Sequence, residues 1–208
     1  KNIIRNILPM SDNFTYLVDD DFLPEGMVQE IHDTLLNSDA EWVLGRQLLS
    51  DDYRFKTNID PYVGSQFNHL FFIDSRIFSP YWEMGCQLIE HFCRKHNINL
   101  MAIMRCKSNL TFPDTAVSPR NTQTPHVDHP WNHFTLLYYI NDADGETILY
   151  NEKFDDENEV VLTELARVSP KAGRAVLFDG LLYHSPTVPS KKYRAVINFT
   201  FLGEFNDS

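Results

Sequence analysis

Residues 124–130 read Thr-Pro-His-Val-Asp-His-Pro. Residues two apart on a β-strand point to the same side, so His126 and Asp128 can aim at one point while Val127 faces away. An imidazole nitrogen and a carboxylate oxygen at one point suit a first-row transition metal. An isolated His-x-Asp is nevertheless a weak signal, because an ordinary hydrogen-bonded pair also explains it. The stretch predicts a metal site only if a third ligand comes from elsewhere in the chain.

The best candidate for that third ligand is His184, in Leu-Tyr-His-Ser-Pro at residues 182–186. Two histidines and one carboxylate form a facial triad, which leaves three neighbouring positions of an octahedral metal open. Non-haem Fe(II) oxygenases use that geometry. We therefore expect His126, Asp128 and His184 to be the metal ligands and the catalytic centre. His129 and His133 lie nearby, but a fourth protein ligand would block an open position, so we interpret them as structural.

Arg194 lies ten residues after His184, in a strand-like segment (193–202) rich in Tyr, Ala, Val, Ile and Phe. An arginine in such a segment is costly to bury without an anionic partner, and the segment contains no Asp or Glu. A carboxylate ligand would satisfy it, because a guanidinium binds carboxylates through two parallel hydrogen bonds. A cross-strand salt bridge is the alternative. The segment thus favours a metal site that also receives a carboxylate ligand.

The second half of the chain consists of short strand-like segments separated by turn residues. The expected strands are 101–106, 134–140, 147–150, 160–168, 175–178 and 193–202. Many short strands without intervening helices predict a β-sandwich or barrel. The length of 208 residues predicts a single domain, 1–208.

The first half is mixed. Apolar residues at helical spacing predict helices over 22–37 and 80–96, with Ser79 as the N-cap of the second and Pro80 at its first position. A short strand is expected at 69–73. The two helices should bury their apolar stripes against one side of the sheet.

The composition limits the partners. A formal net charge of −11 repels phosphate backbones, so nucleic acid is disfavoured. No stretch is apolar enough to span a bilayer, and the start lacks a secretory signal. The three cysteines, Cys86, Cys93 and Cys106, form no CxxC pair and predict reduced thiols in a cytoplasmic compartment.

The last hundred residues, 101–203, resemble the Fe(II)- and 2-oxoglutarate-dependent dioxygenases, particularly their prolyl-4-hydroxylase-like branch. Each motif is weak alone, but the order and spacing of all six together are specific. The motifs are His126-Val127-Asp128, Tyr138-Tyr139-Ile140-Asn141, Gly145-Glu146-Thr147, the stretch 170–178, His184 and Arg194. The resemblance implies a mainly β fold with flanking helices (α+β). Its core, residues 100–205, would be a double-stranded β-helix, a cupin-like jelly-roll, preceded by a mixed region with buttressing helices over 1–99.

Carried over residue by residue, the resemblance implies that the triad holds Fe(II) and that Arg194 clamps the distal carboxylate of 2-oxoglutarate. Tyr139 matches a tyrosine that helps to bind this co-substrate in relatives. Tyr138 and Tyr139 are neighbours on a strand, so one should face the barrel and the other the outside. Asn109 is a further candidate for the co-substrate pocket, from its place before the long loop 113–125.

The implied reaction uses O2 and 2-oxoglutarate, with ascorbate as a compatible reductant, to hydroxylate a peptidyl residue such as proline, or a small molecule. Two departures stand out. Arg194 is ten rather than nine positions after His184, which requires a bulge or a longer turn. Thr200 replaces the second arginine of the DNA-repair dioxygenases, which argues against nucleobase demethylation.

Two alternatives stay open: a non-catalytic metal-binding jelly-roll that acts as a sensor or binding module, and a structural β-sandwich whose His and Asp are incidental. Substrate specificity is expected to lie in loop 113–125, in segment 151–159 and in the first hundred residues. The sequence carries no signal of oligomeric state.

Overall fold

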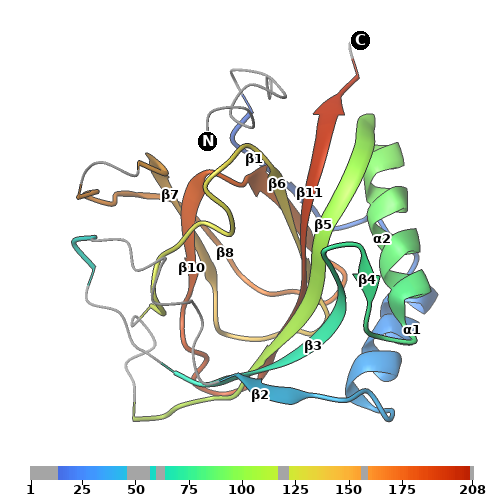
Figure 1. Ribbon diagram of the computed structural model, residues 1–208. Helices are drawn as coiled ribbons and strands as arrows, with labels where there is room; N and C mark the ends of the chain where they lie inside the picture. Colours follow the sequence, from blue (N-terminus) through green and yellow to red (C-terminus); the bar gives the residue numbers. More distant parts are fainter. Residues whose placement is uncertain (1–13, 46–56, 60–63, 117–121, 156–158, 207–208) are drawn as a thin grey trace.

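A computed structural model describes residues 14–45, 57–59, 64–116, 122–155 and 159–206. Parts of the expected specificity segments, 113–125 and 151–159, lie outside the described residues. Two antiparallel sheets face each other, and the chain crosses repeatedly from one sheet to the other (Figure 1).

The larger sheet has the strand order β1-β9-β6-β11-β5-β3-β2, with β4 paired to β3 at one edge. Its strands are β1 (Tyr16–Asp19), β2 (Val43–Gly45), β3 (Gln66–Ile73), β4 (Arg76–Ile77), β5 (Ile98–Thr111), β6 (Phe134–Tyr139), β9 (Ala175–Asp179) and β11 (Arg194–Phe205). The smaller sheet has the order β10-β7-β8, from β10 (Leu182–Pro186), β7 (Thr147–Lys153) and β8 (Glu164–Val168).

The path of the chain identifies the architecture. From β6 onward it passes to the smaller sheet for β7 and β8, returns for β9, crosses again for β10 and returns for β11. This alternation between two facing sheets is a double-stranded β-helix, or jelly-roll. The predicted fold class, mainly β with flanking helices, is confirmed.

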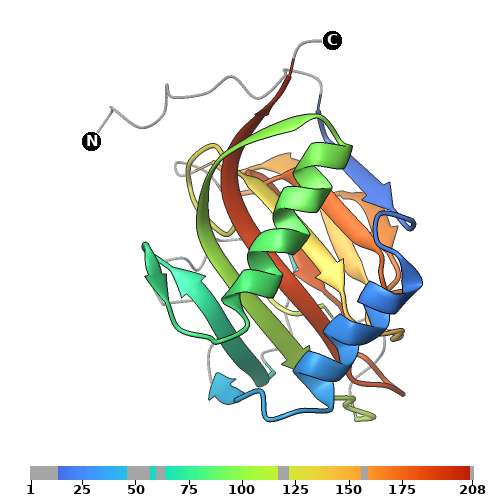
Figure 2. The same ribbon diagram turned by 90° about the vertical axis from the view of Figure 1, so that its right-hand side faces the viewer.

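Helices α1 (Glu25–Leu36) and α2 (Trp82–Lys95) lie across the outer face of the larger sheet (Figure 2). The apolar stripe of α2, including Leu88, Ile89 and Phe92, packs into one cluster with the outward side chains of the sheet. Both helices start and end within three residues of their predicted limits, 22–37 and 80–96. The predicted N-cap Ser79 and first helical residue Pro80 are wrong by two positions, because α2 begins at Trp82 with Tyr81 as its N-cap. Ser79 Oγ instead accepts a hydrogen bond from Tyr81 N–H (3.0 Å) in the turn before the helix.

The N-terminal region also extends the larger sheet. Strand β1 pairs with β9, and β3, which contains the predicted strand 69–73, pairs with β5. The first hundred residues therefore supply strands as well as helices. The division at residue 99 stays a prediction.

One predicted strand, 160–168, is wrong at its start. Regular pairing begins at Glu164. The residues before it use their backbone otherwise: Val160 forms an isolated parallel bridge with Thr57, and Leu162 N–H donates to Asn58 Oδ1 (2.8 Å). The β-branched valines indicated a strand, but a distant segment takes their hydrogen bonds.

The cysteines and the helices bear on the remaining expectations. Cys86, Cys93 and Cys106 are free thiols, and the last two are buried. The cytoplasmic compartment stays a prediction. Among the described residues, no helix combines the length and apolar character needed to cross a membrane.

Candidate functional site

Two of the three predicted ligands are held side by side by backbone pairing. His184 lies in β10, and His126 forms an isolated antiparallel bridge with it. His126 N–H donates to His184 O (3.0 Å), and His184 N–H donates to His126 O (2.9 Å). The two imidazole centroids are 4.5 Å apart. This bridge makes the His126 segment an extra edge of the smaller sheet.

Asp128 completes the group. Its Oδ2 lies 3.9 Å from His184 Nε2, and one potential ligand atom from each of the three residues lies within 4.8 Å of the other two. The segment is not a regular strand, because only His126 is bridged and Asp128 sits in a bend. Val127 nonetheless packs away from the group, in a separate apolar cluster. Two imidazoles and one carboxylate in this arrangement fit an Fe(II) ion with open positions.

The carboxylate of Asp128 is held by a strong partner. Arg105 Nη2 donates to Asp128 Oδ1 at 2.5 Å, and Asn198 Nδ2 lies 3.4 Å from Oδ2. Burial raises the pKa of Asp128, but the positive charges of Arg105 and, more weakly, Lys107 outweigh it and hold the pKa well below its ordinary value. Asp128 is therefore ionised. Because Arg105 occupies Oδ1, Oδ2 is the oxygen available to a metal.

The histidines are in the form that a metal needs. Burial lowers the pKa of His184 to about 3 and also lowers the pKa of His126, so both imidazoles are neutral near pH 7. Nδ1 of His126 lies 2.9 Å from Thr124 O, and Nδ1 of His184 lies 3.3 Å from Leu182 O. We assign the proton to Nδ1 in each ring, because a carbonyl can only accept. Nε2 is then left as the ligand atom in both.

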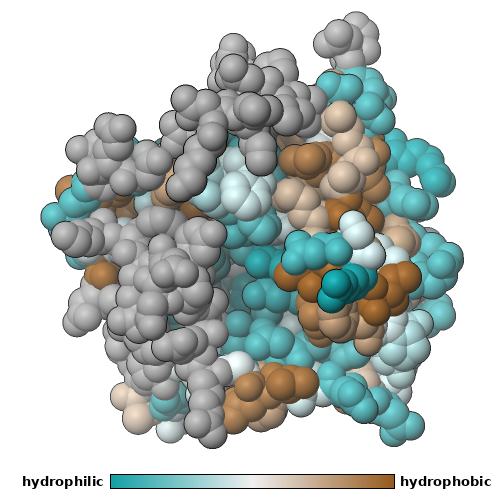
Figure 3. Space-filling view, viewed as in Figure 1, coloured by the Kyte–Doolittle hydropathy of each residue, from teal (hydrophilic) through white to brown (hydrophobic). Residues whose placement is uncertain are grey.

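The triad lines a cavity between the two sheets, of about 500 Å³ including its open mouth. In the orientation of Figure 1, the molecular surface has a hydrophilic recess near its centre (Figure 3). Several buried polar atoms on its wall have no hydrogen-bond partner among the described residues: both amide atoms of Gln123, Asn109 Oδ1, Asn198 Oδ1 and Arg194 Nε. Buried polar groups are normally hydrogen-bonded, so this cavity is built for a polar ligand.

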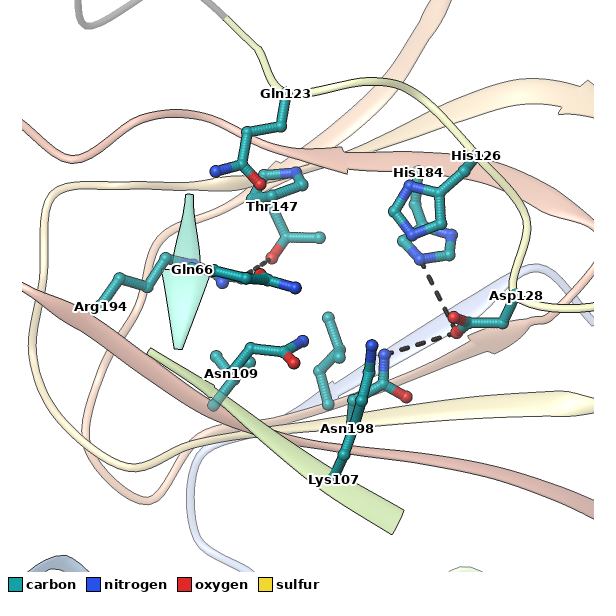
Figure 4. A pocket seen from close by; sticks show the side chains of 13 residues that line it. Gln66, Lys107, Asn109, Gln123, His126, Asp128, Thr147, His184, Arg194 and Asn198 are labelled. Carbon is teal, nitrogen blue, oxygen red and sulfur yellow. Dashed lines mark hydrogen bonds and ion pairs between the residues drawn. The ribbon is translucent and has the colours of Figure 1, made fainter. Parts of the chain in front are cut away.

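Arg194 enters this cavity from the side opposite the triad (Figure 4). It is only 4% exposed, and its Nη2 donates to Thr147 Oγ1 (2.7 Å). No Asp or Glu of the described residues forms an ion pair with it, so the alternative of a cross-strand salt bridge finds no support in the part of the chain that the structure describes. Residues 187–193 form the connecting loop that accommodates the ten-residue spacing.

The two adjacent tyrosines face opposite ways. Tyr138 packs against Phe22 under the helices, with ring centroids 5.8 Å apart. Tyr139 lies between the sheets, where its hydroxyl donates to Thr147 Oγ1 (2.6 Å) and its ring lies 5.5 Å from the Arg194 guanidinium carbon. Tyr139 does not line the cavity, so its influence on a ligand passes through Thr147 and Arg194.

Asn109 lines the cavity, together with polar residues that the sequence argument missed. The missed residues are Gln66, Lys107 and Asn198, whereas Gln123 lies in the expected specificity loop 113–125 and Thr147 in one of the six motifs. A signal for the residues on β5 existed: Arg105, Lys107 and Asn109 alternate with the buried Cys106, Ser108 and Leu110. This period of two predicts a strand with a polar inner face. Lys107 has no hydrogen bond or ion pair with any other described residue, and burial lowers its pKa to about 8.

His129 and His133 do not belong to the ligand group. His129 stacks on Trp131 (centroids 4.8 Å apart, 20° between planes), and its Nε2 lies 3.3 Å from Thr200 Oγ1. His133 Nδ1 contacts Trp131 O (2.7 Å), and its ring packs directly on Gly180. Neither residue lines the cavity, and both have packing roles beside the triad segment.

Comparison with known proteins adds information on the fold. No family model and no curated protein matches the chain. A 2OG-Fe(II) oxygenase family oxidoreductase from Burkholderia pseudomallei is 12% identical, with a TM-score of 0.60 over 90% of this chain and 85% of that one. A Pseudomonas putida prolyl-4-hydroxylase is 16% identical, with a TM-score of 0.55 over 91% and 93%. A Trichoplax adhaerens prolyl hydroxylase in complex with a hypoxia inducible factor peptide fragment is 16% identical, with a TM-score of 0.54 over 91% and 84%.

The chain therefore has the jelly-roll fold of the 2-oxoglutarate–Fe(II) oxygenases. Within that class its structural neighbours include prolyl hydroxylases, the branch that the sequence resembles. The resemblance predicted from the sequence is confirmed at the level of fold.

Proposed function

We propose that this chain is an Fe(II)- and 2-oxoglutarate-dependent oxygenase that hydroxylates a peptidyl residue, such as proline, or a small molecule. The observation that carries the proposal is the pairing of two features in one cavity. A His-Asp-His group of the right donor chemistry lies on one side, and a buried arginine without an acidic partner lies on the other (Figure 4). A ligand that binds a metal at one end and presents a carboxylate at the other would satisfy both.

The residues of this chain have distinct tasks in the proposal. His126, Asp128 and His184 hold Fe(II) and leave its remaining positions open. When bound, the iron supplies the oxidation of a C–H bond by O2, coupled to the decarboxylation of 2-oxoglutarate to succinate and CO2. Arg194 and Thr147 bind the distal carboxylate of 2-oxoglutarate. Arg105 keeps Asp128 ionised and fixes its orientation by a hydrogen bond to Oδ1.

The enclosure of the site also matters. The walls beside the polar groups include Leu137 and Val196, so the ligands meet in a cavity that is partly apolar. Exclusion of water strengthens the ionic contacts of Arg194 and limits side reactions.

The class of substrate is drawn from the structural neighbours. One prolyl hydroxylase structure contains a peptide fragment. The epimerase SnoN, 12% identical with a TM-score of 0.54, was solved with Fe3+, alpha ketoglutarate and nogalamycin RO. We therefore propose peptides and small molecules as the two candidate substrate classes, and a turnover screen against peptide and metabolite libraries separates them.

The test of the proposal measures succinate formed from 2-oxoglutarate with Fe(II), O2 and ascorbate. The wild type should form succinate, and His126→Ala should abolish both succinate formation and Mn(II) binding. The matched control is His32→Ala, a histidine on α1 outside the cavity, which should retain activity. Unchanged turnover in His126→Ala would contradict the proposed metal ligands.

A second variant separates an oxygenase from a non-catalytic metal-binding jelly-roll. Arg194→Met removes a charge-assisted contact, so 2-oxoglutarate should bind about ten- to a hundredfold more weakly while Mn(II) binding is retained. If Arg194→Met binds 2-oxoglutarate as tightly as the wild type does, the non-catalytic alternative is favoured.

A further inference from the structure

Lys107 is a second cation in the cavity. It lies on β5 directly opposite Asn198 of β11, and its side chain points into the space beside the triad (Figure 4). It makes no hydrogen bond or ion pair with another described residue, although its charge lies close enough to lower the pKa of His126 and of Asp128. A largely enclosed ammonium group without a partner is costly to keep, so its presence calls for a ligand.

The charges of the cavity do not balance. Asp128 is the one acid among the described residues that line it, and Arg105 already neutralises that acid. Lys107 and Arg194 are therefore both left without an anion. Because truncating or burying one partner of an ion pair is strongly unfavourable, two uncompensated cations indicate two anionic groups in the bound ligands.

The two cations lie at different ends of the cavity. Lys107 is on the side of the triad, and Arg194 approaches from the other side beside Thr147 (Figure 4). Arg194 precedes Asn198, the register partner of Lys107, by four residues on β11, which separates the two backbone positions by about 13 Å. Their long side chains extend into this interval. A ligand that contacts both cations must therefore carry an anionic group at each of its two ends.

The groups between the two cations fit the same ligand. Asn109 Oδ1 and both amide atoms of Gln123 have no hydrogen-bond partner among the described residues, and both residues line the cavity. The donor in this set is Gln123 Nε2, which can donate to a carboxylate or keto oxygen that the two cations do not reach. An apolar ligand would leave all of these groups unsatisfied.

We propose that Lys107 binds a carboxylate at the metal end of the cavity, so that the cavity is bounded by one cation at each end. This rests on the proposed function, because it is the triad that defines the metal end. Two sources supply the same chemistry: the carboxylate of 2-oxoglutarate next to its keto group, or a carboxylate on the molecule that is hydroxylated.

The first experiment uses the metal-free full chain, so that metal chelation does not mask the contact. Calorimetric titrations compare glutarate, a five-carbon dicarboxylate, with butyrate, which has one carboxylate. The wild type should bind glutarate at least about tenfold more tightly, because a second charge-assisted contact forms. Lys107→Met should remove that preference and leave butyrate affinity unchanged.

Three controls frame this result. Lys107→Arg retains the cation and should keep a preference for glutarate. Lys191→Met removes the same charge from an exposed loop outside the cavity and should bind as the wild type does. Circular dichroism and thermal unfolding establish folding, and Lys107→Gln repeats the titration if the methionine variant is unstable. Equal affinity for glutarate and butyrate in the wild type, or unchanged glutarate binding in both neutral variants, would overturn the proposal.

The second experiment distinguishes the two sources. With Mn(II) bound, weaker binding of 2-oxoglutarate to Lys107→Met assigns the carboxylate to the co-substrate. If Mn(II)-loaded protein binds 2-oxoglutarate normally while metal-free glutarate binding is weakened, the carboxylate belongs to the hydroxylated molecule. Failure of the proposed function would show differently, as absence of succinate formation by the wild type, and the glutarate titration would still report on Lys107.

Discussion

The two faces of the larger sheet differ sharply, although the same strands make both. On β11, Ile197 and Phe199 point outward into the apolar cluster beneath the helices. Arg194 and Asn198, on the same strand, point inward to the cavity. The outer face has apolar side chains packed against apolar side chains. The inner face includes buried polar atoms that lack partners.

This difference separates stability from function. Apolar burial on the outer face stabilises the fold, at about 25 cal/mol per Å² removed from water. Unpaired polar groups on the inner face reduce stability, and proteins retain such groups where a ligand needs them. Packing on the outer face therefore stabilises the sheet, and the stable sheet positions the polar and charged side chains on its inner face.

The largest difference is expected between alanine substitutions at two adjacent residues of β11, one on each face of the sheet. Phe199→Ala should lower the free energy of unfolding by about 3–5 kcal/mol, because it leaves a cavity among fully buried side chains. Asn198→Ala, one residue away on the inner face, should change it by less than about 1 kcal/mol, since its contact with Asp128 is long at 3.4 Å. Denaturant unfolding of both variants measures this. Equal losses in the two would remove the distinction between the faces.

An intermediate effect is expected from acid, through buried histidines such as His129 and His133. Burial lowers the pKa of His129 to about 4 and lowers that of His133, whereas an unfolded histidine has a pKa of about 6.5. Between these values the unfolded state binds more protons, so stability falls as pH falls. Each such histidine contributes at most about 1.4 kcal/mol per pH unit.

The measurement is the unfolding free energy of metal-free protein at pH 7, 6 and 5. His129→Gln removes one of these groups, so its stability should depend less steeply on pH in this window. If the wild type is equally stable at pH 5 and pH 7, or if the variant shows the same slope as the wild type, the lowered pKa of His129 does not contribute to the pH dependence of stability.

The smallest effect is expected from the two adjacent tyrosines. Tyr139→Phe removes the hydroxyl that donates to Thr147, which should cost about 0.5–1.5 kcal/mol of stability and weaken 2-oxoglutarate binding by up to about tenfold. The hydroxyl of Tyr138 is buried and has no hydrogen-bond partner in the part of the chain that the structure describes, so Tyr138→Phe should be neutral or slightly stabilising. Thermal unfolding and calorimetry would show the contrast. Identical behaviour of the two variants would argue against a role for Tyr139 behind Arg194.

Much of the fold was predictable because its strands and helices leave local patterns. The apolar stripes of both helices and the strands near Phe134 and Ala175 follow from periodicity and agree with the structure. The triad was predictable for a different reason. His126 and Asp128 are close in sequence, and His184 stands in a segment of strand character, so three residue types with one chemistry could be grouped before any pairing was known.

The remaining site residues depend on pairings between distant segments. Strand β5 was expected to end at Cys106, because Lys107 and Asn109 interrupt its apolar pattern, whereas these polar residues face the cavity. Gln66 reaches the cavity only because β3 pairs with β5, a register that local sequence does not determine. Arg105 likewise had no visible partner until the fold placed it against Asp128.

The reciprocal backbone bonds between His126 and His184 have a consequence for the lifetime of the metal site. Any local opening that separates the two histidines must break both bonds, and it frees both amide protons at once. Hydrogen exchange at these two amides therefore measures how often the site comes apart. A bound metal should slow both exchange rates together, so the two rates, measured with and without metal, report how strongly the metal suppresses opening of the site.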